Sequence, residues 1–380
     1  MKTGIANIPL DYGTCPRWLF ERMTKLSRAI VQEIVIEFGP EEFLKRLSDP
    51  VWFQSFGSVL AFDWNSSGLT TTTCGALKMG IWGLERDLGI FICGGKGKTS
   101  RKTPEQIINW ADRLNFSQDL ADKLVYSSKI SAKVDNTAIQ DGFQLYHHTF
   151  LFTKNGNWAV VQQGMNEQFG QARRYHWLSD TLQQVQGKLD YVEEPHTGIS
   201  SQVRLKPLNL TAKESKQNKK VSTELITGGF NTLVADLEFI KEKQTGQMNL
   251  FRKLEMPDDS VLPQLTGDLN FAKSKYLGKI LRNVHEKAPT DFEQVLMSEG
   301  VGPMTVRALS LVSELIYGAK PSYEDPARYS FAFGGKDGVP FPVNRGVYDK
   351  TLALIEKGIK KSQLSFSEKE KALHRFMKSL

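Results

Sequence analysis

The stretch LYHHTFLFTKNGNWAVVQQG, residues 145–164, places two apolar strand patterns on either side of Asn155-Gly156. Asn-Gly is the dipeptide that best suits the tight two-residue turn of a β-hairpin. The stretch therefore predicts two antiparallel strands joined by that turn. Further strands are expected in four other segments: 58–64, 88–98, 172–179 and 190–196.

Helical patterns alternate with these strands along the first half of the chain. Residues 17–39 read as an amphipathic helix closed by Gly39, and helical periods also fill 104–115 and 118–139. This alternation predicts an α/β domain over residues 1–204, a mixed sheet with flanking helices, with ribonuclease H-like architecture as an analogy. A helical connector over 205–285 and a helical domain over 286–380 are expected to follow.

The composition is that of an ordinary soluble protein with a basic balance. The 380 residues carry a formal net charge of +7, which favours anionic partners such as nucleic acid. We find no run of about 18 uncharged apolar residues, so no membrane span is expected. The three cysteines lack a metal-binding spacing, which fits reduced thiols in a cytoplasmic protein. A homodimer is one possible assembly of this chain.

A second informative stretch is FEQVLMSEGVGPMTVRALSLVSELIYG, residues 292–318. Two short helical patterns meet there at Gly300-Val301-Gly302, and Pro303 suits the first position of the second helix. This arrangement resembles the helix-hairpin-helix DNA-binding motif, in which backbone N–H groups at the hairpin contact phosphate. Thr305 and Arg307 are the side chains expected to assist. An ordinary αα-hairpin with a glycine turn is the alternative.

Some helix-hairpin-helix domains belong to base-excision glycosylases, and PFPVNRGVYDKTL (340–352) is a distant match to the segment that follows their hairpin. The position of the catalytic lysine is occupied here by Met304, and that of the aspartate by Asn344. Because neither the amine nor the carboxylate is present, the resemblance implies binding only.

Basic residues in the first half of the chain form two candidate nucleic-acid contacts. Lys96 and Lys98 lie in the glycine-lysine loop GGKGK, which suits an anion but lacks the spacing of a P-loop. Arg173 and Arg174 precede three aromatic rings in ARRYHWL, a pattern that suits a single strand. The same alternation also describes a strand with one buried face.

Carboxylates and histidines near these cations predict a divalent-metal site. Oxygen ligands hold Mg²⁺ or Mn²⁺, and such a metal activates water for phosphodiester hydrolysis. Strand alternation places His147 and His148 on opposite faces, so both cannot ligate one metal from a regular strand. The candidate catalytic residues are Asp63, Asp135, Asp141, Lys133 and His148, and the candidate metal ligands are Asp63, Asp135, Asp141, His147 and Glu193.

Several polar stretches, read with the hairpin, resemble a prokaryotic family catalogued as a domain of unknown function that ends in a helix-hairpin-helix. The stretches include FDWNSSGLTTTT (62–73), CGGKGKTSRKT (93–103) and YVEEPHTG (191–198). The features together favour a DNA-processing protein, foremost a metal-dependent nuclease whose hairpin holds DNA. The alternatives are a non-catalytic DNA-binding or repair accessory protein, and a phosphate-ester or nucleotide enzyme.

Overall fold

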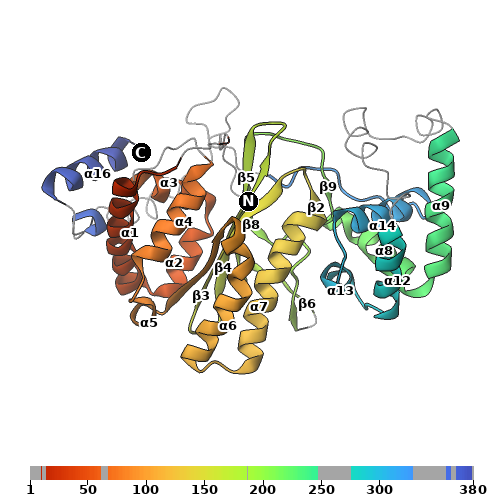
Figure 1. The fold of residues 1–380 in the computed structure, drawn as a ribbon, viewed down its shortest axis with the longest axis horizontal. Helices are drawn as coiled ribbons and strands as arrows, with labels where there is room; N and C mark the ends of the chain where they lie inside the picture. The colour runs from red at the N-terminus through yellow and green to blue at the C-terminus, as the bar shows by residue number, and fades with distance from the viewer. Residues whose placement is uncertain are drawn as a thin grey trace.

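The computed structural model describes residues 10, 14–60, 67–185, 187–246, 275–327, 357–360 and 365–378. Its helices, coloured along the chain in Figure 1, are α1 Arg17–Phe38, α2 Pro40–Leu47, α3 Pro50–Val59, α4 Gly68–Gly80, α5 Glu85–Leu88, α6 Thr103–Leu114, α7 Gln118–Lys133, α8 Lys216–Gly228, α9 Phe230–Gly246, α12 Lys275–Glu286, α13 Phe292–Met297, α14 Pro303–Leu315 and α16 Phe366–Lys378. Its strands are β1 Ile90–Lys96, β2 Ile139–Gln140, β3 Gln144–Thr153, β4 Trp158–Asn166, β5 Gln171–Leu178, β6 Gln184–Val185, β7 Lys188–Leu189, β8 His196–Ser200 and β9 Leu208–Asn209.

A five-stranded sheet of order β1-β3-β4-β5-β8 forms the centre of the fold. The predicted hairpin is confirmed as β3 and β4, and Gly156 in its turn has a φ of 85°. Every neighbouring pair is antiparallel, whereas the sequence predicts a mixed sheet. Short turns link β3 to β4 and β4 to β5, and a short turn can only join antiparallel neighbours. The structure is therefore a mixed α/β fold built on an antiparallel sheet.

Helices cover both faces of the sheet, as Figure 1 shows, with α1 to α4 on one side and α6 and α7 on the other. Strand β1 shows why, because its side chains alternate between two apolar cores. Ile90 and Ile92 pack with the first group of helices, while Phe91 and Cys93 pack with the second. This near-continuous apolar run is typical of a strand that is buried on both faces.

The second core extends beyond the sheet to the later helices. It joins Phe150 and Trp158 of the sheet to Val306 and Leu309 of α14 through α7 and α8. A single bridge between Asn209 of β9 and Ser322 also ties the segment after α14 to the region beside the sheet. The helices α8, α9 and α12 to α14 therefore pack as a group beyond α7 (Figure 1).

The predicted strand over 58–64 is wrong at its start, because Ser58 and Val59 belong to α3. Asp49 begins that helix by accepting hydrogen bonds from the backbone N–H groups of Val51 and Trp52, and Pro50 occupies its first turn. Residues 61–64 lie outside the described residues.

The predicted strand over 190–196 is also wrong up to Pro195. Asp190 Oδ1 accepts from the N–H groups of Val192 and Glu193, which makes a turn, and β8 begins only at His196. The predicted helices 17–39, 104–115 and 118–139 are confirmed as α1, α6 and α7, the last continued by the π-helical turn Val134–Ala138.

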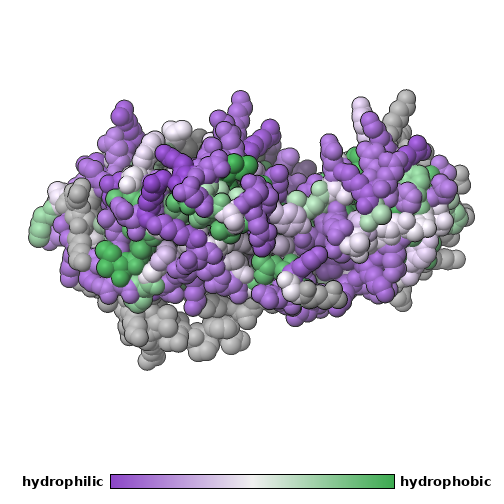
Figure 2. All heavy atoms as spheres, turned by 90° about the horizontal axis from the view of Figure 1, so that it is seen from below, coloured by the Kyte–Doolittle hydropathy of each residue, from purple (hydrophilic) through white to green (hydrophobic). Residues whose placement is uncertain are grey.

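The surface in Figure 2 is mainly hydrophilic, with separated apolar patches and no continuous apolar band. Within the described part of the chain, none of the helices has both the length and the apolar character needed to cross a bilayer.

Candidate functional site

A cavity of about 690 Å³ lies where α7, the turn after β1, the start of β3 and the hairpin between α13 and α14 meet. Three segments that the sequence singles out separately contribute to it: the glycine-lysine loop, the end of α7 with β3, and the Gly-Val-Gly turn. Its lining is Ser100, Arg101, Thr103, Pro104, Ser128, Lys129, Ala132, Lys133, Asn136, Thr137, Gln144, Leu145, Tyr146, His147, His148, Gln162, Met297, Val301, Gly302 and Pro303.

The charge of this lining is one-sided. Arg101, Lys129 and Lys133 contribute three cationic groups, and none of the described lining residues is Asp or Glu. Lys133 Nζ donates a hydrogen bond to the carbonyl oxygen of Val301, which holds the ammonium between the two walls of the cavity. Burial lowers the pKa of Lys133. An ammonium has three N–H donors, so two remain for a bound group.

The helical hairpin forms one wall. Asp291 Oδ1 accepts from the N–H of Gln294 at 2.8 Å and begins α13, and Pro303 occupies the first turn of α14. Gly300 has a φ of 80°, a left-handed conformation that glycine adopts without a steric penalty. Gly302 is extended, and no side chain caps the N-terminus of α14. The first N–H groups of this helix therefore lack intrahelical acceptors beside the cavity.

Of the two side chains expected to assist the hairpin, Thr305 is buried and Arg307 is hydrogen-bonded within the protein. Thr305 is only 2% exposed. Arg307 Nε donates to Gln140 Oε1 at 2.7 Å, and Gln140 Nε2 donates to the carbonyl oxygen of Pro303 at 2.8 Å. This geometry leaves the backbone of the turn, rather than these side chains, as the surface that faces the cavity.

The glycine-lysine loop continues β1 into a tight turn over Gly97–Lys102. Lys96 and Lys98 are exposed, and Lys96 Nζ lies 6.0 Å from the ring centroid of Tyr146. Of the basic residues in this loop, only Arg101, further along the turn, is among the cavity-lining residues. The anion contact predicted for Lys96 and Lys98 stays a prediction, because neither of them is among the lining residues of the cavity.

His147 and His148 point to opposite faces of β3, as the alternation predicts. His148 is hydrogen-bonded to Ser128 Oγ at 2.9 Å and to Gln162 Oε1 at 2.8 Å, and burial lowers its pKa to about 4. His147 bonds to Thr149 Oγ1 at 2.9 Å, and burial lowers its pKa to about 3. Both imidazoles are neutral at neutral pH.

Asp135 lies in the π-helical turn after α7 and is fully buried. Its carboxylate accepts from Gln162 Nε2 at 2.6 Å and from Trp177 Nε1 at 3.0 Å on one oxygen. The other oxygen lies 2.5 Å from His196 Nε2. Protein donors therefore occupy both oxygens of this predicted metal ligand.

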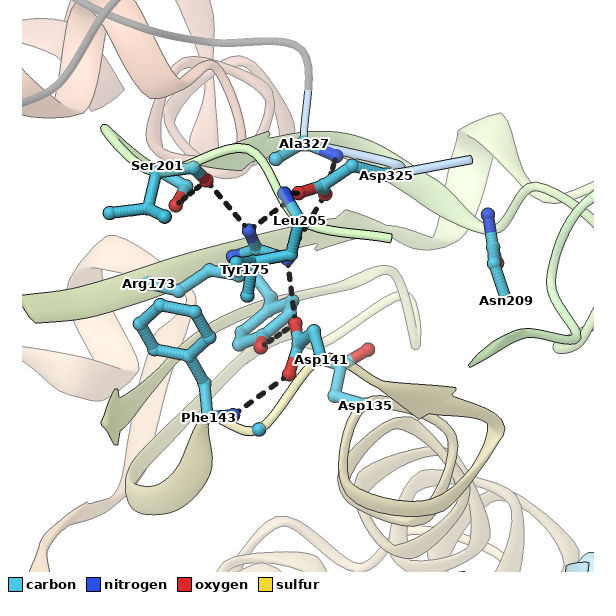
Figure 3. A network of polar contacts seen from close by, with 12 residues as sticks. Asp135, Asp141, Phe143, Arg173, Tyr175, Ser201, Leu205, Asn209, Asp325 and Ala327 are labelled. Carbon is cyan, nitrogen blue, oxygen red and sulfur yellow. Dashed lines mark hydrogen bonds and ion pairs between the residues drawn. The ribbon is translucent and has the colours of Figure 1, made fainter. Parts of the chain in front are cut away.

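Asp141 belongs to a different network, drawn in Figure 3. It accepts from Arg173 Nη1 at 2.8 Å, from Tyr175 Oη at 2.7 Å and from the N–H of Phe143 at 3.0 Å. Burial raises the pKa of Asp141, and the guanidinium of Arg173 opposes that shift. The dashed contacts of Figure 3 do not join Asp141 to Asp135.

The two arginines of β5 are both buried. Arg173 also contacts Asp325 and the carbonyl oxygen of Val203. Arg174 donates to Gln54 Oε1 at 2.9 Å and to His176 Nε2 at 2.8 Å, and burial lowers its pKa to about 9. The sequence predicts that these two arginines contact nucleic acid, whereas both guanidinium groups form their contacts inside the protein.

Within the described residues, the predicted metal ligands do not lie together. Glu193 lies 4.0 Å from Lys219 Nζ, in a third location, and Asp63 lies outside the described residues. Among His, Cys, Asp and Glu side chains of the described ranges, no group of three or more could hold a metal ion. Lys133, His147 and His148 do share the cavity with Val301 and Gly302.

Two functional candidates escape sequence reasoning. Ser128 and Lys129 lie on α7 one turn before Lys133, on a helix whose pattern looks like an ordinary amphipathic one. The spacing of Lys129 and Lys133, four residues apart on one helix face, is the only local signal. Ser128 becomes visible only through its contact with His148, which is 20 residues away.

Residues 4–343 match the model of a family described as "Protein of unknown function (DUF763)". No curated protein and no solved structure matches the chain. The family match covers nearly the whole chain, in agreement with the resemblance seen in the polar stretches of the sequence. The chain belongs to the DUF763 family.

Proposed function

We propose that this protein binds nucleic acid, with DNA as the first ligand to test, and that the cavity beside α14 receives backbone phosphate. The observation that carries this proposal is the one-sided lining of Arg101, Lys129 and Lys133 with no carboxylate among the described lining residues. A concave cationic surface concentrates anions, because opposing charges are absent and the low-dielectric walls focus the field.

The position of the helical hairpin supports the same ligand. The N-terminus of α14, which has no side-chain cap, meets Lys133 at this cavity through the Lys133–Val301 hydrogen bond. Helix N-termini favour phosphate because their free N–H groups and dipole both attract negative charge. A helix-hairpin-helix role for α13 and α14 would use these backbone groups, which position a duplex without reading its sequence.

The arrangement favours binding over metal-dependent hydrolysis by the predicted carboxylates. Asp135 and Asp141 accept hydrogen bonds from separate sets of protein donors, and neither lines the cavity. The nuclease hypothesis with Mg²⁺ or Mn²⁺ therefore rests on Asp63, outside the described residues, and calls for its own test.

The binding test compares two triple variants that remove the same charge. Arg101, Lys129 and Lys133 are changed to alanine in one, and the exposed Arg17, Lys25 and Lys45, on the α1–α2 side of the sheet, in the other. Fluorescence anisotropy with labelled duplex and single-stranded DNA at several salt concentrations gives the affinity. Each lost phosphate contact should lower the magnitude of the salt slope by about 0.9.

We expect the cavity variant to bind at least about tenfold more weakly, and the control variant to match the wild type. Equal effects in the two variants would mean that net charge, not the cavity, determines binding. Incubation of the same DNA with the protein and Mn²⁺, Mg²⁺ or EDTA, followed by gel electrophoresis, tests hydrolysis. Cleavage only in the samples that contain metal would support the nuclease hypothesis.

A further inference from the structure

The hydroxyl of Ser128 faces a histidine at the wall of the cationic cavity. Ser128 Oγ lies 2.9 Å from His148 Nε2, and both residues line the cavity with Lys133. Neighbouring Ser127 differs, because its Oγ bonds to the carbonyl oxygen of Lys123 and to Tyr191 Oη. One helix thus carries two adjacent serines, of which only one is paired with an imidazole.

The proton positions follow from a chain of contacts that begins at Trp177. An indole N–H can only donate, so Asp135 Oδ2, which Trp177 Nε1 approaches at 3.0 Å, is an acceptor oxygen. The same oxygen lies 2.6 Å from Gln162, whose side-chain nitrogen must therefore face it. The carbonyl oxygen of that amide then faces His148 Nδ1 at 2.8 Å.

This orientation of Gln162 fixes the tautomer of His148. Because Gln162 Oε1 can only accept, the proton of the neutral imidazole lies on Nδ1. Nε2 is then left with its lone pair directed at Ser128, which must donate. The sequence Ser128, His148, Gln162, Asp135 therefore has the logic of a nucleophile, a base and groups that orient the base.

We infer that Ser128 is a nucleophile for phosphodiester chemistry in this cavity, with His148 as its general base and Gln162 as a positioning residue. The substrate class rests on the proposed phosphate binding, whereas the nucleophile rests on the contacts of Ser128. In this tautomer His148 Nε2 carries no proton and lies 2.9 Å from Ser128 Oγ, so it is placed to accept the proton of the hydroxyl.

The chemistry balances without an added oxidant or reductant. Ser128 Oγ forms a bond to phosphorus while its proton passes to His148 Nε2, and the bond from phosphorus to one ester oxygen breaks. The departing alkoxide takes the proton from His148 and leaves as an alcohol. Water then attacks phosphorus with His148 as base, the bond from phosphorus to Ser128 Oγ breaks, and His148 returns the proton to Oγ, which releases a phosphate monoester and restores Ser128. Arg101, Lys129 and Lys133 offset charge on the phosphoryl oxygens.

The experiment uses a fluorophosphonate, an uncharged phosphorus electrophile that reports nucleophilic serines and does not depend on phosphate binding. Wild type, Ser128→Ala and Ser127→Ala are incubated with the probe, and the adduct is located by mass spectrometry. We expect one phosphonyl group on Ser128, retained in Ser127→Ala and lost in Ser128→Ala. Melting temperature and DNA affinity show that each variant is folded.

Two further variants distinguish an effect on the reactivity of Ser128 from an effect on folding. His148→Gln should slow labelling by about 100-fold, the typical contribution of general-base catalysis. Gln162→Leu should lower the maximal labelling rate while leaving the half-saturating probe concentration unchanged. If the labelling rate falls only in proportion to the loss of folded protein, these residues have a structural role instead.

The outcomes distinguish this inference from the proposed function. Label on Ser128 in a protein that binds no DNA would support the nucleophile and overturn the phosphodiester class. DNA binding without label, or label elsewhere than Ser128, would overturn the inference and leave the binding function intact.

Discussion

Arg173 Nη1 lies 2.8 Å from Asp141 Oδ2, while Nη2 of the same guanidinium lies 2.9 Å from Asp325 Oδ2. The Arg173 side chain is fully buried, and the two carboxylates are at most 6% exposed. A buried guanidinium between two carboxylates adds little unfavourable free energy to the folded state only while all three groups remain. Removal of one group leaves an uncompensated buried charge. This contact also joins β5 to the segment after α14.

We therefore predict that Arg173→Met lowers the free energy of unfolding by about 3–5 kcal/mol. Urea unfolding followed by circular dichroism measures the change. Arg17→Met serves as the control, because Arg17 has a side chain 94% exposed and should cost less than about 0.5 kcal/mol. A loss at Arg173 no larger than at Arg17 would show that the carboxylates are neutral or rearranged.

Gly94→Ala should be strongly destabilising. A Cβ there would lie 2.2 Å from the carbonyl oxygen of His148 and 2.6 Å from Thr103 Oγ1, and φ is +85°. Overpacking and left-handed strain together predict a loss of about 2–5 kcal/mol in the free energy of unfolding. Gly170→Ala provides the comparison, because φ is +60° but no atom lies within 4 Å of its added Cβ. A similar loss in both variants would assign the effect to backbone strain alone.

At Gly302, shape and charge can be separated by two substitutions. Nothing lies within 4 Å of a Cβ added to Gly302, and its backbone is extended, so Gly302→Ala should fold and bind DNA normally. Gly302→Asp adds a carboxylate beside Lys133 and should weaken DNA binding and flatten its salt dependence. Anisotropy titrations measure both. Equal DNA binding by the two variants would show that the hairpin does not contact DNA.

Acidification should destabilise the protein through its buried histidines. The pKa of His148 is about 4 and that of His176 is well below its usual range, in both cases because of burial. Below about pH 6.5 the unfolded chain binds protons that the folded protein does not, so stability falls as pH falls. For His148 the loss runs from pH 6.5 to 4 and amounts to about 3 kcal/mol.

Urea unfolding at intervals between pH 7.5 and 4.5 tests this dependence. His148→Asn should reduce the pH slope by up to about one proton per molecule, because one fewer group titrates on unfolding. A slope unchanged in the variant would mean that His148 is protonated in the folded state.

Local signals account for the parts of the fold that the sequence predicts correctly. The β3–β4 hairpin follows from Asn155-Gly156, and the α13–α14 turn follows from Gly300, Gly302 and Pro303. The apolar run at 58–64 misleads because buried helices and buried strands share such a pattern, and the decisive cap at Asp49 lies nine residues earlier.

The candidate site is predicted less well because it depends on contacts between distant segments. Lys133 and Val301 are 168 residues apart, and no periodicity indicates that they touch. The carboxylates and arginines of the predicted metal and nucleic-acid sites are plausible by type, but their roles depend on which donors surround them. Asp135 with Trp177 and Asp141 with Arg173 are examples of such pairings.

The Arg173–Asp325 contact also bears on the order of events during synthesis. Because these residues are 152 positions apart, a nascent chain that has not yet reached Asp325 holds Arg173 with only one of its two carboxylate partners. A chain that has not yet reached Val301 also lacks the cavity wall that Val301 and Gly302 form. A ribosome paused before Val301 would therefore carry a sheet without its complete cavity, and the proposed phosphate site would be completed late in translation.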